Sequence, residues 1–151
     1  MSQKLPLAML IELAQNKTDQ ATRRLGQLQN THTSAVEKLD MLQQYRQEYL
    51  EQMNGQMRDG VAAASVRNFQ HFIGTLDGAI EQQRALTEQA DTRLGHGRSD
   101  WQDSKRRLSS FDTLADRVRQ QEMTIVNKKE QRDSDERSAR QFYLRATASA
   151  H

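Results

Sequence analysis

The sequence of 151 residues has no cysteine, one proline and few aromatic residues, which make up 5% of the chain. Without thiols, disulfide bonds and thiolate chemistry are excluded, which fits a reducing cytosol. Away from the expected loop, the longest apolar run is Leu7 to Ile11, whereas a membrane span needs roughly 20 apolar residues. The first residues also lack the basic end and long apolar segment of a secretory signal. We therefore expect a soluble, cytoplasmic protein with no transmembrane segment.

Large apolar side chains are also too scarce to fill a multilayer core. Hydrophobic residues make up 35% of the chain and charged residues 28%. These hydrophobic residues are sufficient for a seam between two helices, where each position buries only part of its surface. The composition therefore favours a thin helical assembly over a compact domain.

Apolar residues recur at alternating steps of three and four, without a change of phase, along two stretches of the chain. The first stretch runs from Leu7 to Met53 and the second from Phe69 to Ile125. A repeat that averages 3.5 residues keeps one narrow stripe facing a partner helix. We predict an all-α fold, an antiparallel two-helix coiled-coil hairpin that is an elongated monomer on its own. Its polar seam residues, His32, Arg46 and Gln83, are expected to fix the register.

The turn signals set the expected boundaries within residues 1–151, which we interpret as one elongated hairpin. Helix one is predicted over about 6–54, because Pro6 suits a first turn and Asn54-Gly55 favours a helix end. The connection is predicted at about 55–65 and helix two at about 66–125 or beyond. Paired positions should then sum to roughly 122, which leaves a charged extension, 126–151. We expect this extension to be a fraying helix or disordered unless a partner holds it. Gly95-His-Gly97 lies within helix two and is interpreted as a soft bend.

No arrangement of residues predicts catalysis or a cofactor. The four histidines are scattered, and no His or carboxylate cluster has metal-ligand spacing. Gly74 and Gly78 lie inside the helical pattern and lack the following Lys-Ser or Lys-Thr of a phosphate loop. Because a helical hairpin also offers no concave pocket, we predict a protein that is not an enzyme and that has no metal or cofactor site.

Charge and lateral apolar residues indicate binding partners instead. The net charge is −2 through Ser104 and +4 from Lys105 onward, so the C-terminal third suits an acidic partner. The charges are too mixed for nucleic acid binding, for which a steep salt dependence would be the test. Several apolar residues also lie beside the seam and form either a thicker helix contact or a docking stripe. They are Val36, Tyr45, Leu50, Phe72, Ala79 and Leu86.

Two segments carry a resemblance to a known family. Residues 39–49 (LDMLQQYRQEY) and 67–83 (RNFQHFIGTLDGAIEQQ) resemble the first-helix and second-helix signatures of the FliJ family, the coiled-coil component of flagellar type III export. The resemblance extends over nearly the whole sequence. It also includes the charged end of the chain and the residues Trp101, Leu108, Phe111, Leu114 and Arg117. Gly95-His-Gly97 departs from the family pattern.

The resemblance implies a hairpin similar to the central stalk of rotary ATPases, with partners at two places. One is the cytoplasmic domain of the membrane export gate, and the residues that match its contact are Leu42, Tyr45, Tyr49, Phe72, Leu76, Ala79 and Gln83. The other is the export ATPase hexamer, whose ring would hold the end of the hairpin that carries Leu13, Arg23, Arg24, Arg107, Phe111, Leu114 and Arg117. The family also assists the recycling of substrate chaperones. These roles imply a cytoplasmic protein peripherally associated with the membrane at the flagellar base, active in motility and chemotaxis.

Two alternatives remain open from the sequence. The chain could be the equivalent stalk of a virulence-type secretion system, or a generic scaffold coiled coil that dimerises through both seams.

Overall fold

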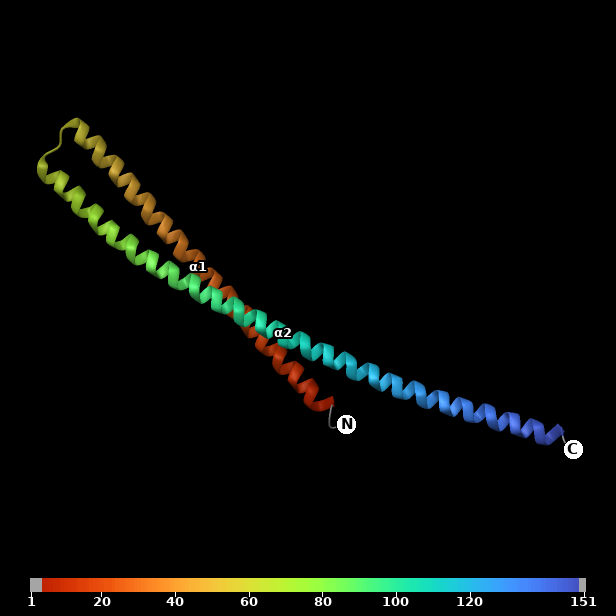
Figure 1. Cartoon of the computed structure of the whole chain (residues 1–151). Coiled ribbons are helices and arrows are strands. Elements are labelled where there is room, and N and C mark those ends of the chain that lie inside the picture. The colour runs from red at the N-terminus through yellow and green to blue at the C-terminus, as the bar shows by residue number, and fades with distance from the viewer. Residues whose placement is uncertain (1–3, 150–151) are drawn as a thin grey trace. The chain divides into compact units, whose positions relative to one another are not determined.

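A computed structural model describes residues 4–149 of the chain. These residues form two long helices, α1 (Lys4–Asp59) and α2 (Ala63–Ser149), and no strand (Figure 1). The predicted all-α class is therefore confirmed. Contacts divide the chain into two units. They are a hairpin unit, Gln15–Lys105, and a terminal unit, of which the structure describes residues 4–14 and 106–149.

The turn of the hairpin unit is shorter than the sequence predicted. Helix α1 continues through Asn54-Gly55 to Asp59, and α2 begins at Ala63, so the connection is 60–62 and not 55–65. A glycine inside a helix costs only about 1 kcal/mol, which the neighbouring turns of helix outweigh here. The chain reverses at Gly60 instead, whose φ of 82° lies in the left-handed region that other residues avoid.

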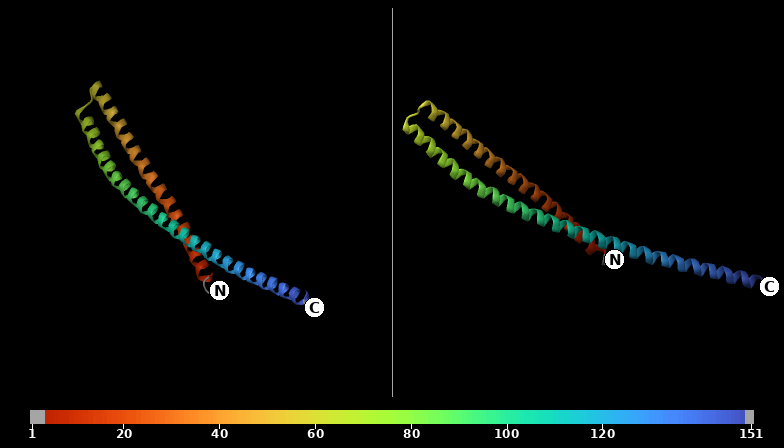
Figure 2. Two further views of the ribbon diagram at one scale, coloured as in Figure 1. Left: turned by 45° about the vertical axis from the view of Figure 1, so that its right-hand side comes forward. Right: turned by 45° about the horizontal axis from the view of Figure 1, so that its top comes forward.

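The two arms of the hairpin unit run side by side and antiparallel (Figures 1 and 2). Three hydrogen bonds between them define the register. Thr18 Oγ1 lies 3.3 Å from the Ser104 carbonyl oxygen, and Trp101 Nε1 donates to Thr22 Oγ1 over 3.0 Å. Further along, Gln83 Nε2 donates to the Ala35 carbonyl oxygen over 3.1 Å. The residue numbers of two of these pairs sum to 122 and 123, as the predicted register requires, and those of the Gln83–Ala35 pair sum to 118.

The polar residues in the seam each have a partner across it. His32 Nε2 lies 3.6 Å from Asp91 Oδ1, and the Arg46 guanidinium pairs with the Asp77 carboxylate. Gln83 is only 6% exposed, and its amide is satisfied by the Ala35 carbonyl. Polar pairs of this kind lower stability relative to apolar ones but fix the register, because sliding would leave them unpaired.

Gly97 has a packing role that the sequence did not reveal. It is buried, and α2 remains an α-helix through Gly95 and Gly97. A Cβ atom at position 97 would lie 2.4 Å from Leu28 Cδ1, whereas one at position 95 would meet nothing within 4 Å. Gly97 therefore provides the space in which the Leu28 side chain sits.

In the terminal unit, the start of α1 packs against the middle of α2. Leu7, Ala8 and Ile11 of α1 line one apolar groove together with Ala115 and Val118 of α2. All predicted seam positions of the chain are buried or partly buried, with the exception of Ile125, which is 67% exposed. The prediction for Ile125 was wrong, because on a register near 122 no described residue of α1 lies opposite it.

The charged extension is helical instead of frayed. Helix α2 continues to Ser149, and every described side chain from 123 onward is exposed. Neither glycine nor proline occurs between residues 98 and 149, so no residue strongly disfavours the helix there. Residues 150 and 151 of the predicted extension lie outside the described residues.

Candidate docking surfaces

The described residues include neither a candidate metal site nor a candidate membrane span. No group of three or more His, Cys, Asp or Glu residues between positions 4 and 149 could hold a metal ion. No helix over the same residues is long and apolar enough to cross a membrane.

An aromatic cluster lies near the turn of the hairpin unit. Tyr49 contacts two rings of α2, with centroid distances of 4.4 Å to Phe72 and 5.2 Å to Phe69. Tyr45 lies 6.3 Å from Phe72 and 6.4 Å from Tyr49 by the same measure. Such offset and tilted pairs contribute about 0.5–1.5 kcal/mol each beyond area burial. The cluster therefore joins the two arms and presents an aromatic surface at its edge.

Heptad positions show which lateral residues share a side of the hairpin. With the seam residues assigned to positions a and d, Tyr45, Phe72, Ala79 and Leu86 all take position g. Antiparallel helices bring g positions together, as the contact between Tyr45 and Phe72 requires. Val36 and Leu50 take position e and lie on the other side. The predicted lateral stripe is therefore two separate edges, of which only the g edge carries the aromatic cluster.

The seven residues matched to the gate contact all occupy d or g positions, so they lie toward the same edge. Tyr45 is 50% exposed, and Leu42, Tyr49, Phe72 and Ala79 are partly buried. Leu76 and Gln83 are only 7% and 6% exposed. These two side chains lie within the seam and support the surface without forming it. We call the remaining five residues, Leu42, Tyr45, Tyr49, Phe72 and Ala79, the aromatic patch.

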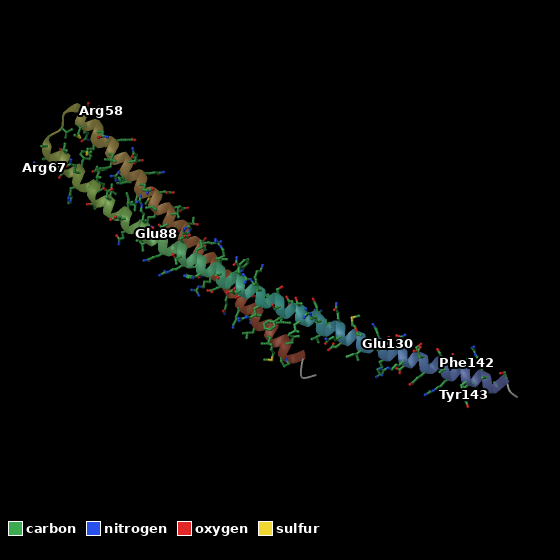
Figure 3. The ribbon with its side chains drawn as sticks, in the orientation of Figure 1. Arg58, Arg67, Glu88, Glu130, Phe142 and Tyr143 are labelled. Atoms are coloured by element: carbon green, nitrogen blue, oxygen red, sulfur yellow. The ribbon has the colours of Figure 1, made fainter. Side chains whose placement is uncertain are left out.

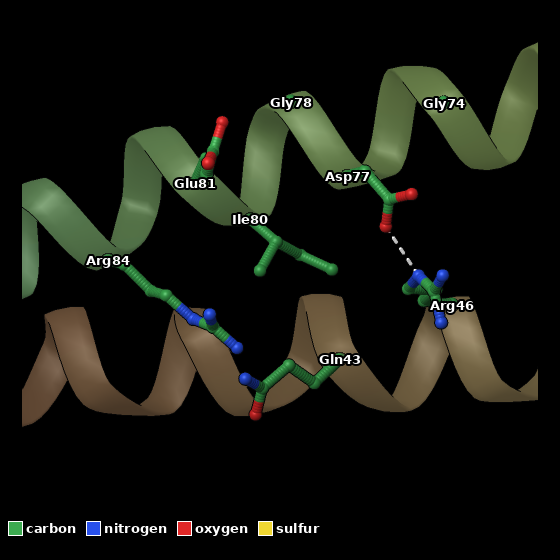
Figure 4. A pocket seen from close by; sticks show the side chains of 8 residues that line it. All are labelled: Gln43, Arg46, Gly74, Asp77, Gly78, Ile80, Glu81 and Arg84. Carbon is green, nitrogen blue, oxygen red and sulfur yellow. Dashed lines mark hydrogen bonds and ion pairs between the residues drawn. The ribbon is translucent and has the colours of Figure 1, made fainter.

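The opposite edge of the hairpin unit carries a polar groove of about 670 Å³ (Figure 4). Gly74 and Gly78 line one wall of the groove and contribute no side chain to it. Arg46 and Asp77, which pair with each other, also line the groove. The remaining lining residues are Gln43, Ile80, Glu81 and Arg84. The lining has charges of both signs and no nucleophile beside a base, so the groove does not suggest catalysis.

The residues matched to the ATPase ring divide between the two units. Leu13, Arg107, Phe111, Leu114 and Arg117 belong to the terminal unit, whereas Arg23 and Arg24 belong to the hairpin unit. Leu13 is 51% exposed and Leu114 is 46% exposed, and the four arginines are exposed as well. Phe111 is partly buried. Apolar and basic side chains are thus available for contact on the terminal unit.

Sequence reasoning missed two features of these surfaces. It assigned Phe69 to the seam alone, yet its ring completes the aromatic cluster with Tyr49. It also did not indicate that Asp77 pairs with Arg46, on the edge opposite Tyr45. The difference between e and g positions would have separated the two edges from the sequence.

The comparisons with known proteins agree along almost the full chain. A family model described as "Flagellar FliJ protein" matches residues 3–147. A flagellar FliJ protein of Salmonella typhi is 35% identical over 136 residues, which cover 90% of this chain and 92% of the relative. A flagellar FliJ protein of Escherichia coli (strain K12) is 32% identical over 130 residues, which cover 86% and 88%.

Proposed function

The chain belongs to the FliJ family of flagellar proteins and is a component of flagellar protein export, and from this premise we propose that it is a non-enzymatic stalk. In this proposal the stalk binds the export ATPase hexamer through its terminal unit. It binds the cytoplasmic domain of the membrane export gate through the aromatic patch, and it assists the recycling of substrate chaperones. The protein would act in the cytoplasm, peripherally associated with the membrane at the flagellar base.

The observation that carries the gate contact is the aromatic patch with its half-exposed Tyr45. Tyr45 exposes half of its side chain beside Phe72 and Tyr49, on an edge where neither helix covers it. Tyrosine is enriched among residues that dominate binding energies, because it combines a large apolar ring with a polar end. The rings of Phe72 and Tyr49 restrict the positions that the Tyr45 side chain can take, which lowers the entropy lost on binding.

The substitution Tyr45→Ala tests this contact. We expect gate binding to weaken by about 1–3 kcal/mol, which is typical of an interface anchor, while the helix content stays unchanged because Tyr45 is half exposed. Calorimetry with the purified cytoplasmic domain of the gate measures the affinity. The matched control is Met57→Ala, since Met57 is 52% exposed but takes an e position on the other edge. Wild-type affinity of the Tyr45→Ala variant would remove the aromatic patch from the proposal.

The ATPase contact is supported by exposed apolar side chains and by the basic character of the terminal unit. Leu13 and Leu114 are about half exposed, and the sequence from Lys105 onward carries 11 basic and 7 acidic residues. Long-range attraction to an acidic surface would raise the rate of association, and the leucines would provide buried area.

The double variant Leu13→Ala/Leu114→Ala tests this end of the molecule. We expect it to lower the stimulation of the purified export ATPase and to leave gate binding as in the wild type. The Tyr45→Ala variant should show the converse pattern, with full stimulation and weak gate binding. If each variant lost both activities, the division of partners between the two surfaces would be contradicted.

A further inference from the structure

The last part of α2 carries an apolar face that includes none of the residues assigned above to the ATPase or the gate. Phe142 is 77% exposed and Tyr143 is 69% exposed, the highest values among the aromatic side chains of the described residues (Figure 3). Together with Ala139 and Ala146 they follow the spacing i, i+3, i+4, i+7, which places four side chains on one side of a helix. This face and its neighbouring side chains are all exposed, so no other described segment of the terminal unit covers it.

Three arginines surround this face in a regular arrangement. At about 100° per residue, Arg140 and Arg145 each lie about 110° from its centre, one on either side, and Arg137 lies almost opposite. Leu144 is on the polar side, near Arg137 and Arg140. Arginine side chains beside an apolar face can extend toward polar groups while the face itself is buried.

Acidic residues are absent from the same segment. The stretch 137–149 contains three arginines and no Asp or Glu, although the preceding stretch 128–136 has four acidic residues among its basic ones. The end of the described helix is thus both aromatic and uniformly basic. This combination, rather than the exposed rings alone, indicates what covers the face.

We propose that residues 137–149 form an interfacial helix that binds the surface of an anionic phospholipid bilayer. Phe142 and Tyr143 enter the boundary between headgroups and acyl chains, and the flanking arginines contact the lipid phosphates. The face is narrow, with only two large side chains, which suits shallow binding to a lipid surface better than the several anchors of a helix bound in a protein groove. This inference does not depend on the proposed contacts with the ATPase or the gate.

Vesicle flotation with the full-length protein tests the proposal. The vesicles contain either one part phosphatidylglycerol to two parts phosphatidylcholine, or phosphatidylcholine alone. We expect the protein to float with the anionic vesicles, to stay behind with the neutral ones, and to be released by high salt. Binding to both kinds of vesicle alike, or to neither, would overturn the proposal.

Two variants and a matched control identify the segment. Arg137→Gln/Arg140→Gln/Arg145→Gln should lower the lipid partition coefficient about 100-fold, because each basic residue near an anionic surface contributes about fivefold. Phe142→Ala/Tyr143→Ala should lower it about tenfold. The control, Lys128→Gln/Lys129→Gln/Arg132→Gln, removes the same charge from the mixed stretch and should change it less than about fivefold.

Helix content measured by circular dichroism should be unchanged in all three variants, since the substituted side chains are exposed. An equal loss in the control and in the arginine variant would indicate general attraction of the whole chain and overturn the assignment. The assignment would also be wrong if the aromatic variant kept its lipid binding but lost ATPase stimulation, because the face would then belong to a protein interface.

Discussion

Replacing Gly97 by alanine tests the closest approach between the arms of the hairpin unit. The added Cβ atom would lie 2.4 Å from Leu28 Cδ1, 3.8 Å from Leu28 Cγ and 3.9 Å from Leu25 Cδ1. A separation of 2.4 Å is well inside van der Waals contact, so Leu28 must change its rotamer or the helices must separate locally. Leu28 is partly buried in the seam, which restricts the positions its side chain can take.

The expected effect is a sum of two opposing contributions. An extra methyl group in a packed contact typically costs about 1–3 kcal/mol. Replacing glycine by alanine inside a helix contributes about 1 kcal/mol in the other direction. Gly97→Ala should therefore leave stability unchanged or reduce it by up to about 2 kcal/mol. Gly95→Ala is the matched control, because its Cβ meets nothing within 4 Å, and it should stabilise the protein by about 1 kcal/mol.

Urea unfolding followed by circular dichroism measures both variants against the wild type. The double variant Leu28→Ala/Gly97→Ala completes the comparison, because it removes the atom that would clash. In the Leu28→Ala background, the Gly97→Ala substitution should become stabilising, as at position 95. Equal stabilisation by Gly97→Ala and Gly95→Ala in the wild-type background would refute the close approach of Leu28.

Two further predictions concern the buried amide and the turn. Gln83→Leu replaces a side chain that is 6% exposed and donates a hydrogen bond to the Ala35 carbonyl. We expect the free energy of unfolding to change by no more than about 1 kcal/mol. Gate affinity should stay unchanged, in contrast to Tyr45→Ala. A loss of gate affinity, measured by calorimetry, would show that Gln83 contributes to the contact with the gate. Gly60→Ala should destabilise the hairpin by about 1–2 kcal/mol because its φ is 82°, whereas Gly55→Ala, inside α1, should raise stability by up to about 1 kcal/mol. Equal effects of the two glycine substitutions in urea unfolding would contradict a turn at Gly60.

The heptad repeat was sufficient to predict the class of fold, the seam and its register. Such a repeat is a local property of the sequence. An apolar residue at position a or d predicts that its own side chain is buried, even when the residue opposite it is unknown. The repeat also extended the seam to Ile125, which is exposed, because periodicity on one helix carries no information about where the other helix stops. The helix end at Asp59 was missed for a related reason: Asn54-Gly55 is a weak local signal that a long continuous helix overrides.

The candidate surfaces depended more on three-dimensional proximity. The sequence supplied Tyr45 and Phe72 as unusual apolar residues beside the seam, and their contact is present in the hairpin unit. The prediction grouped the aromatic edge with the edge that carries Val36 and Leu50, although their g and e positions already differ in the sequence. The heptad repeat placed Leu76 in the seam and Tyr45 beside it, whereas the resemblance grouped both as gate contacts; Leu76 is 7% exposed and Tyr45 is 50% exposed.

The order of the residues alone determined that two helices form and which stripe of each faces the other, because a repeat of 3.5 residues has a single buried face. Only the tertiary structure decided how closely the arms approach. The separation of the two arms leaves space for the Leu28 side chain beside Gly97. It also brings carboxylates close to His32 and Arg46, and it leaves Tyr45 half exposed. Each of these depends on the separation of side chains that are far apart in the sequence, which no local pattern specifies.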